Sequence, residues 1–362
     1  MCAATSSSAS GNGTGPGPSP VDWGLAVATA HRLMRPGPVI PRAEAEHTVT
    51  ELRDVTTVAE GHVRALTGLG EGLPLHPGEV VDRHGWVVAA AEGLEALTEG
   101  ALPVPSSRYF GGVLATSAGV QAGLVLAYLG GRVLGQYDPF GGAEQPGRLL
   151  LVAPNVVAAQ QALDVPADDF RMWVCLHECT HRLQFTAVPW LRGYFAGEVG
   201  RFLSGLDETA SSALNRLPEV IKAVRRRTTE GGEPGGLGLM EVLQSPEQRA
   251  VFDRLIALST LLEGHADHVM DAVGPAVVPS VATIRQRFTA RRRGGGLLDR
   301  ILRALLGVDA KVRQYALGAA FTREVIDAVG MTGFNAVWTS PETLPLRSEI
   351  SDAPAWLRRV HG

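Results

Sequence analysis

Two histidines four residues apart enclose a glutamate in the segment His177-Glu178-Cys-Thr-His181. An α-helix turns by about 100° per residue, so residues four apart lie about 40° from each other, one turn along. Both imidazoles can therefore bind one metal ion from the same face of a helix. Glu178 can reach a water on that ion without being a ligand itself. The pattern is typical of zinc hydrolases, in which the ion acidifies a water and the glutamate accepts its proton.

The residues around this motif predict a buried helix. Asp168 and Asp169 suit the N-terminus of a helix of about 17 residues, and Pro189 lies just past its end. The alternative is an ordinary helix with two surface histidines. Against it, the neighbours are strongly apolar: Phe170, Met172, Trp173, Val174, Leu176, Leu183 and Phe185. Histidines inside such a helix need a shared partner, which favours a metal.

Two cysteines lie within the same segment, each two residues before a histidine. Two residues correspond to about 200° of rotation, so Cys175 and Cys179 point away from the face that would bind the metal. We expect them to be small core residues rather than ligands.

The segment Leu-Leu-Glu-Gly-His-Ala-Asp-His at 261–268 offers a third ligand. Glu263 and Asp267 are four residues apart on one helix face. Such a pair supplies a ligating carboxylate and a second carboxylate that orients a ligating imidazole. His265 and His268 are the alternative ligands. Glu263 follows His181 by 82 residues, so only the fold can bring these side chains together.

The two motifs together resemble the zincin-like metallopeptidase family of actinobacteria, catalogued as coenzyme F420 biosynthesis-associated proteins. The likeness continues through Lys-Val-Arg-Gln-Tyr at 311–315 and Trp-Thr-Ser-Pro-Glu-Thr-Leu-Pro at 338–345, and covers roughly residues 20–360. The family is of the gluzincin type. The resemblance therefore implies His177, His181 and Glu263 as zinc ligands and Glu178 as the general base. In well-studied gluzincins the two motif helices lie much closer in sequence. The F420 label marks an association and supplies no reaction.

Two further parts of such a site can be proposed. Tyr315 is a candidate to stabilise an oxyanion, with His268 as the next choice. The alternative for Tyr315 is a core tyrosine with a satisfied hydroxyl. Residues 148–153 precede the motif helix and could be the edge strand that holds an extended peptide by main-chain pairing. The alternative is a buried structural strand.

The elements that position these residues are mostly helices. Helical spacing of apolar residues starts near residue 21, is interrupted by three prolines at 36–41, and resumes at 47–66, 85–97, 196–224, 246–273 and 297–330. Two short apolar runs, 131–137 and 148–153, flank a turn signal at 138–142 and predict two strands. Residues 225–236 and 291–296 are expected to be loops. The sequence thus predicts a mainly α fold with a small β-sheet, in which the zincin motif lies on the active-site helix.

Composition limits the class of protein. The chain has 362 residues, of which 45% are hydrophobic and 19% charged, and its net charge is −4. A chain without a basic excess is not built mainly to bind nucleic acid or an anionic membrane. Three cysteines exclude a disulfide framework. We expect a disordered tail at 1–20 and a single unit at 21–362, with a helical part at 21–130 and a catalytic part at 131–362.

One segment challenges the expectation of a protein without a membrane span. Residues 109–131 form a run of 23 residues without a charge, long enough to cross a bilayer. Its six glycines and its polar residues favour a buried core helix. No secretory signal precedes it, which favours a cytoplasmic location.

The prediction is a zinc-dependent hydrolase, a metallopeptidase that acts on a peptide or small amide. Two alternatives stay open: a zinc-fold scaffold or interaction protein without activity, and a zinc hydrolase of a non-peptide amide in cofactor metabolism. The sequence predicts no oligomeric state.

Overall fold

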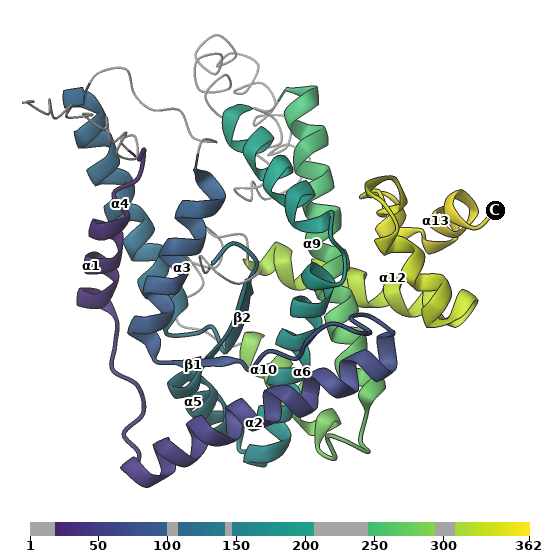
Figure 1. Cartoon of the computed structure of the whole chain (residues 1–362), viewed down its shortest axis with the longest axis horizontal. Helices are drawn as coiled ribbons and strands as arrows, with labels where there is room; N and C mark the ends of the chain where they lie inside the picture. Colours follow the sequence, from purple (N-terminus) through teal and green to yellow (C-terminus); the bar gives the residue numbers. More distant parts are fainter. Residues whose placement is uncertain (1–18, 100–107, 142–146, 206–244, 294–307) are drawn as a thin grey trace, which may run out of the picture.

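A computed structural model describes residues 19–99, 108–141, 147–205, 245–293 and 308–362. In this part of the chain the protein is mainly helical, with one three-stranded sheet (Figure 1). The strands are β1 (Glu79–Val81), β2 (Gly135–Asp138) and β3 (Arg148–Val152). Their order is β1-β3-β2, with β1 parallel and β2 antiparallel to β3. The mainly α fold with a small sheet is confirmed, although β1 was not expected.

Strand β3 is apolar from residue 149 to residue 152 because both of its faces are covered there. Leu150 and Val152 pack into one hydrophobic cluster, while Leu149 and Leu151 pack into the other. The expectation that residues 148–153 form the substrate-binding edge strand is therefore wrong. Among the described strands β3 is central, and β2 occupies the edge beside the motif helix. A run of consecutive apolar residues indicates a strand buried on both sides, whereas an edge strand carries more polar residues.

One face of the sheet is covered by α1 (Trp23–Leu33), α3 (Arg83–Thr98) and α4 (Arg108–Gly130) (Figure 1). Helix α4 is the uncharged segment. A Cβ atom at Gly119 would lie 2.5 Å from the main-chain oxygen of Asp22, and one at Gly123 would lie 2.6 Å from that of Ala26. These glycines let α4 approach α1 closely. The expectation of a buried core helix is confirmed only for this side of α4, because Val120, Leu124 and Val125 are exposed. Among the described helices, none combines the length and apolar character that crossing a membrane requires.

The other face of the sheet carries the helices that build the site. They are α2 (Arg42–Thr67), α6 (Ala167–Thr186), α9 (Pro246–Val273) and α12 (Val308–Phe334), with α5 (Ala153–Leu163), α10 (Val281–Arg293) and α13 (Ala353–Val360) around them. Residues 191–205 are also helical. The predicted helices at 47–66, 85–97 and 246–273 and the motif helix are confirmed. The predicted loop at 225–236 and residues 1–18 of the predicted tail at 1–20 lie outside the described residues. The predicted loop at 291–296 is wrong for residues 291–293, which belong to α10. The division into a helical and a catalytic part stays a prediction.

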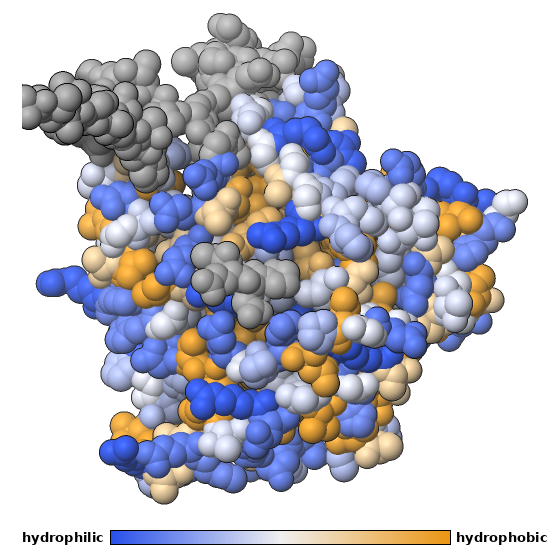
Figure 2. Space-filling view, in the orientation of Figure 1, coloured by the Kyte–Doolittle hydropathy of each residue, from blue (hydrophilic) through white to orange (hydrophobic). Residues whose placement is uncertain are grey.

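Two contacts fix the motif helix and its neighbours. Arg182, directly after His181, forms an ion pair with Glu60 of α2, and both side chains are buried. Gly264 of α9 meets Gly318 of α12 at a close crossing, where a Cβ on Gly264 would lie 2.1 Å from the carbonyl carbon of Gly318. Outside these cores the surface is mixed, and Figure 2 shows hydrophobic residues interspersed with hydrophilic ones on the face displayed.

Candidate metal centre

Helices α6 and α9 bring together the two histidines and the glutamate that the sequence singled out. His177, His181 and Glu263 each offer one ligand atom, and these atoms all lie within 4.8 Å of one another. Within the described residues they form the only such group of three. The 82 residues that separate Glu263 from His181 are thus bridged by the packing of α9 against α6.

The separations of these atoms fit a single small cation. The Nε2 atoms of His177 and His181 are 3.2 Å apart, and Oε2 of Glu263 lies 3.6 Å from the first and 3.8 Å from the second. A tetrahedral zinc site with bonds of about 2.0–2.1 Å places its donor atoms about 3.3 Å apart. Two imidazoles and one carboxylate are also a donor set of catalytic zinc sites, which keep the fourth position open. The donor set and its spacing suit zinc.

The buried side-chain amide of Gln184 contacts the ring of His181 at Nδ1. This Nδ1 lies 2.9 Å from Oε1 of Gln184, which is fully buried. The amide nitrogen of Gln184 lies 3.0 Å from the main-chain oxygen of Leu262 and 3.1 Å from Nδ1 of His265, both on α9. Gln184 follows His181 by three residues, and this spacing places the two side chains on neighbouring positions of one helix face. Gln184 was not among the predicted site residues, although its three-residue spacing from His181 is visible in the sequence.

One contact of His177 comes from a methionine of α9. Its Nδ1 lies 3.3 Å from the thioether sulfur of Met270 on α9. Asp267 also contacts Arg285: its Oδ1 lies 3.5 Å from Nη1 of Arg285, whose Nη2 donates to the main-chain oxygen of Asp267. The expected role of Asp267 in orienting an imidazole stays a prediction. A glutamine thus contacts Nδ1 of His181, and a methionine contacts Nδ1 of His177. Neither side chain belongs to a metal-ligand motif, so the spacing of histidines and carboxylates did not predict these contacts.

Glu178 lies against β2, the edge strand. A Cβ on Gly135 would come within 2.6 Å of Cγ of Glu178, so only a glycine lets the strand pass this close. Glu178 is 6% exposed. Burial raises the pKa of its carboxyl to about 7, the charge of Glu263 adds to the rise, and His181 and the main-chain N–H of Tyr137 oppose it. A glycine inside a strand often marks a place where another group approaches the main chain closely, but the sequence did not indicate that Glu178 is this group.

The charges around the site also shift the pKa values of its histidines. In the metal-free protein, burial alone would lower the pKa of His181, but Glu263 and Glu178 outweigh it and raise the value to about 9. The ring is then protonated at neutral pH, and it must release one proton to bind a metal. Burial lowers the pKa of His265 to about 3, so this histidine is neutral. Burial also lowers the pKa of His268. Neither His265 nor His268 belongs to the cluster of possible ligands among the described residues.

The two cysteines of the motif helix are core residues, as expected. Cys175 and Cys179 are fully buried, and the Sγ of Cys179 donates to the main-chain oxygen of Thr56 on α2. Burial raises the pKa of Cys175 to about 12 and that of Cys179 well above its usual range. Both thiols therefore stay protonated at neutral pH.

Tyr315 lies on α12, one turn before Gly318, but its side chain is outside the described part of the structure. A role for Tyr315 as an oxyanion donor stays a prediction.

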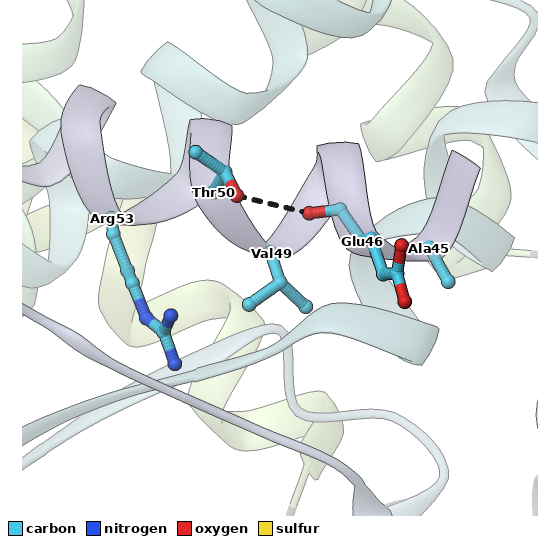
Figure 3. Close-up of a pocket in the computed structure, with 5 residues that line it drawn as sticks. All are labelled: Ala45, Glu46, Val49, Thr50 and Arg53. Carbon is cyan, nitrogen blue, oxygen red and sulfur yellow. Dashed lines mark hydrogen bonds between the residues drawn. The ribbon is translucent and has the colours of Figure 1, made fainter. Parts of the chain in front are cut away.

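A separate surface hollow lies on α2 and is lined by Ala45, Glu46, Val49, Thr50 and Arg53 (Figure 3). Figure 3 shows the Glu46 and Arg53 side chains at opposite ends of this hollow, and Thr50 Oγ1 donates to the main-chain oxygen of Glu46 at 3.1 Å. Glu46 is paired with Arg42 on the same helix. None of the clustered ligand atoms lines this hollow, so it is distinct from the candidate metal centre.

Comparisons with known proteins agree with this geometry. A model of the family described as zincin-like metallopeptidase matches residues 21–357. A solved structure from Chloroflexus aurantiacus, described as a candidate hydrolase with a novel fold, is 31% identical, with a TM-score of 0.65, and the match covers 94% of this chain and 99% of that one. No curated protein matches. Because the family model spans nearly the whole chain and its motif residues converge, the chain belongs to the zincin-like metallopeptidase family.

Proposed function

We propose that this protein is a zinc-dependent hydrolase, a metallopeptidase that cleaves amide bonds. His177, His181 and Glu263 would hold the zinc ion, and Glu178 would act as the general base. The observation that carries the proposal is the convergence of the three ligand atoms beside the buried carboxyl of Glu178.

When bound, zinc acidifies a water and polarises a carbonyl oxygen. Glu178 supplies the proton acceptor. Burial raises its pKa to about 7 in the metal-free protein, and a zinc ion nearby would lower it, which favours the carboxylate form that takes up a proton and later returns it to the leaving amine. The main-chain N–H of Tyr137 holds the Glu178 carboxylate, and Gly135 leaves room for it. The base is thus positioned by the edge strand as well as by its own helix.

The outer side of β2 supports a peptide as the substrate. The N–H of Val152 donates to the oxygen of Leu134 at 2.8 Å. Because main-chain groups alternate along an antiparallel pair, those of Gly135 and Tyr137 point away from β3, toward the side where Glu178 lies. Because Glu178 already accepts from the N–H of Tyr137, an extended chain could pair with the other main-chain groups on this side. Beyond Glu178, this end of the strand carries an aromatic cluster with an arginine over one ring: Tyr137, Phe140, Phe185, Phe195 and Arg192.

Three finer statements stay predictions from the sequence. They are the actinobacterial grouping with its coenzyme F420 association, the cytoplasmic location, and the absence of nucleic-acid and membrane partners.

Zinc content tests the ligand assignment. Protein purified without added metal should contain about one zinc per chain by elemental analysis. His177→Ala, His181→Ala and Glu263→Ala should each lose it, because each removes one of only three protein ligands. His268→Ala is the matched control from the same helix as Glu263 and should keep its zinc. Loss of zinc in His268→Ala together with retention in Glu263→Ala would show that the ligand set is wrong.

Glu178→Gln tests the chemistry. Glutamine keeps the size of the side chain but cannot accept the proton. Zinc content should stay unchanged while hydrolysis falls at least about 10²-fold, the usual scale for a lost general base. The assay uses a mixed peptide library and a set of small amides near neutral pH, with a chelator control. Equal hydrolysis by both proteins would refute the mechanism. Wild-type activity on small amides alone would favour a non-peptide substrate, and no activity on either set would favour a scaffold.

A further inference from the structure

Gln184 links the two helices of the candidate metal centre. It belongs to α6, its side chain is fully buried, and its amide makes three contacts. Oε1 lies 2.9 Å from Nδ1 of His181, and Nε2 lies 3.0 Å from the main-chain oxygen of Leu262 and 3.1 Å from Nδ1 of His265. Leu262 directly precedes Glu263, so one side chain touches a ligand on one helix and the turn that carries a ligand on the other.

The chemistry of these contacts fixes the orientation of the amide. A main-chain oxygen can only accept, so the group of Gln184 that faces Leu262 must be the NH₂. The second hydrogen of that NH₂ faces Nδ1 of His265, which accepts it. The carbonyl oxygen of Gln184 is therefore the atom that faces His181. A carbonyl oxygen can only accept, so Nδ1 of His181 must carry a hydrogen.

These hydrogen bonds, from Leu262 through Gln184 to His181, determine which nitrogen of His181 is available to a metal. With a hydrogen on Nδ1, the lone pair of the neutral ring is on Nε2. Nε2 is the atom that lies 3.2 Å from Nε2 of His177 and 3.8 Å from Oε2 of Glu263. The oxygen of Leu262 thus selects, through one glutamine, the ring nitrogen that faces the centre of the cluster.

We propose that Gln184 is a positioning residue that fixes the tautomer of His181, so that Nε2 is the ring nitrogen available to the metal. This role rests on the proposed zinc site. Partners that orient ligating imidazoles usually change metal affinity by about 10–100-fold when they are removed. Gln184 has no charge, so it holds the ring without adding a negative charge to a site that already contains Glu178 and Glu263.

Two substitutions separate this role from ordinary core packing. Gln184→Leu removes the acceptor for His181 and the donor for Leu262, and zinc affinity should fall about 10–100-fold. Gln184→Glu also removes the donor for Leu262, but its carboxylate still accepts from Nδ1 of His181. Both variants should melt at lower temperature than wild type, whereas Gln184→Glu should bind zinc nearly as tightly as wild type.

Gln160→Leu is the matched control. Gln160, on α5, also donates from its amide to a main-chain oxygen, that of Val165 at 3.0 Å, and it belongs to none of the contacts at the cluster. Its substitution should lower the melting temperature slightly and leave zinc affinity unchanged. Affinities are measured by competition with a chromogenic chelator, so that no substrate is needed.

The tautomer itself can be observed. Two-bond ¹H–¹⁵N correlation spectra of zinc-loaded protein with ¹⁵N-labelled histidine should show His181 protonated on Nδ1 and coordinated through Nε2. Coordination through Nδ1 would overturn the proposal even if Gln184→Leu fails to fold. Equal zinc affinity of wild type and Gln184→Leu would overturn it too, as would an equal loss in the Leu and Glu variants. In those cases the proposed zinc site stands, whereas a wild type that binds no zinc refutes the site and the positioning role together.

Discussion

At the residue scale, the position of the Glu178 carboxyl depends on the absence of a side chain at Gly135 in the neighbouring strand β2. Gly135 has no Cβ, and the space that a Cβ would need is occupied by Cγ and Cδ of Glu178, 2.6 and 2.8 Å from it. The clash would be with a side chain and not with the main chain. A larger residue at position 135 should therefore move the carboxyl of Glu178 rather than break the fold.

Gly135→Ala should lower hydrolysis with little effect on zinc content. A displacement of the order of 1 Å at a catalytic group can cost about 10²-fold in rate. Gly131→Ala is the control, because a Cβ there meets nothing within 4 Å. The measurements are the turnover rate and the elemental zinc content of both variants. Full activity in Gly135→Ala would mean that the strand does not position Glu178.

The raised pKa of Glu178 also predicts a pH dependence of stability in metal-free protein. The folded carboxyl has a pKa of about 7 against an ordinary value of 4.5. A group with a raised pKa contributes stability that is fully present below about 4.5 and is lost as pH rises through about 7. Wild type should lose up to about 3 kcal/mol over this range relative to Glu178→Gln, whose amide does not titrate. Urea unfolding with a chelator at pH 4.5, 6 and 8 measures this difference, and parallel curves for the two proteins would contradict it.

At the scale of elements, the crossing of α9 and α12 depends on two glycines. A Cβ on Gly264 would lie 2.1 Å from the carbonyl carbon and 2.4 Å from the carbonyl oxygen of Gly318. Main-chain atoms inside a helix cannot move aside as a side chain can. Since Glu263 directly precedes Gly264, a shift of α9 at this point also moves a ligand.

Gly264→Ala should therefore destabilise the protein, although alanine favours a helix by up to about 1 kcal/mol over glycine. Overpacking of a core typically costs about 1–3 kcal/mol. Gly61→Ala in the middle of α2 is the opposite case, because nothing lies within 4 Å of its Cβ, and it should stabilise the protein. Chemical unfolding of both variants tests the contrast. Equal stabilisation by the two substitutions would show that the helices separate without cost.

At the scale of the whole molecule, the candidate metal centre joins elements that the chain keeps far apart. Helix α6 packs on α2 from the N-terminal part and on α9 from the C-terminal part. Strand β3 inserts alternate residues into the two hydrophobic clusters on either side of the sheet. A metal bound between α6 and α9 is therefore expected to stabilise the fold as well as the site.

Zinc should raise the melting temperature, because a ligand that binds only the folded state stabilises it. At a free zinc concentration of one hundred times Kd the gain is about 2.7 kcal/mol. Calorimetry with and without a chelator measures it. His181→Ala, which lacks a ligand, should show no zinc-dependent shift. A shift of equal size in that variant would place the stabilising ion elsewhere.

The sequence by itself determined the residues and the helices that carry them. Fixed helical geometry places His177 and His181 on one face, so four-residue spacing was sufficient to predict their convergence. The same reasoning gave the mainly helical fold and the helix at 246–273, whose bounds agree with α9. These are local properties, set by one turn of helix and by the nearest caps and breakers.

Only the tertiary structure decided which residues of different helices and strands come into contact. The pairing of Glu263 with the two histidines, the approach of Gly135 to Glu178 and the contact of Gln184 with Leu262 each join residues far apart in sequence. The central place of β3 was missed for the same reason, since strand order follows from packing between segments. Helix geometry determines the directions in which side chains a few residues apart point. Contacts between elements depend instead on how the two hydrophobic clusters pack on the two faces of the sheet.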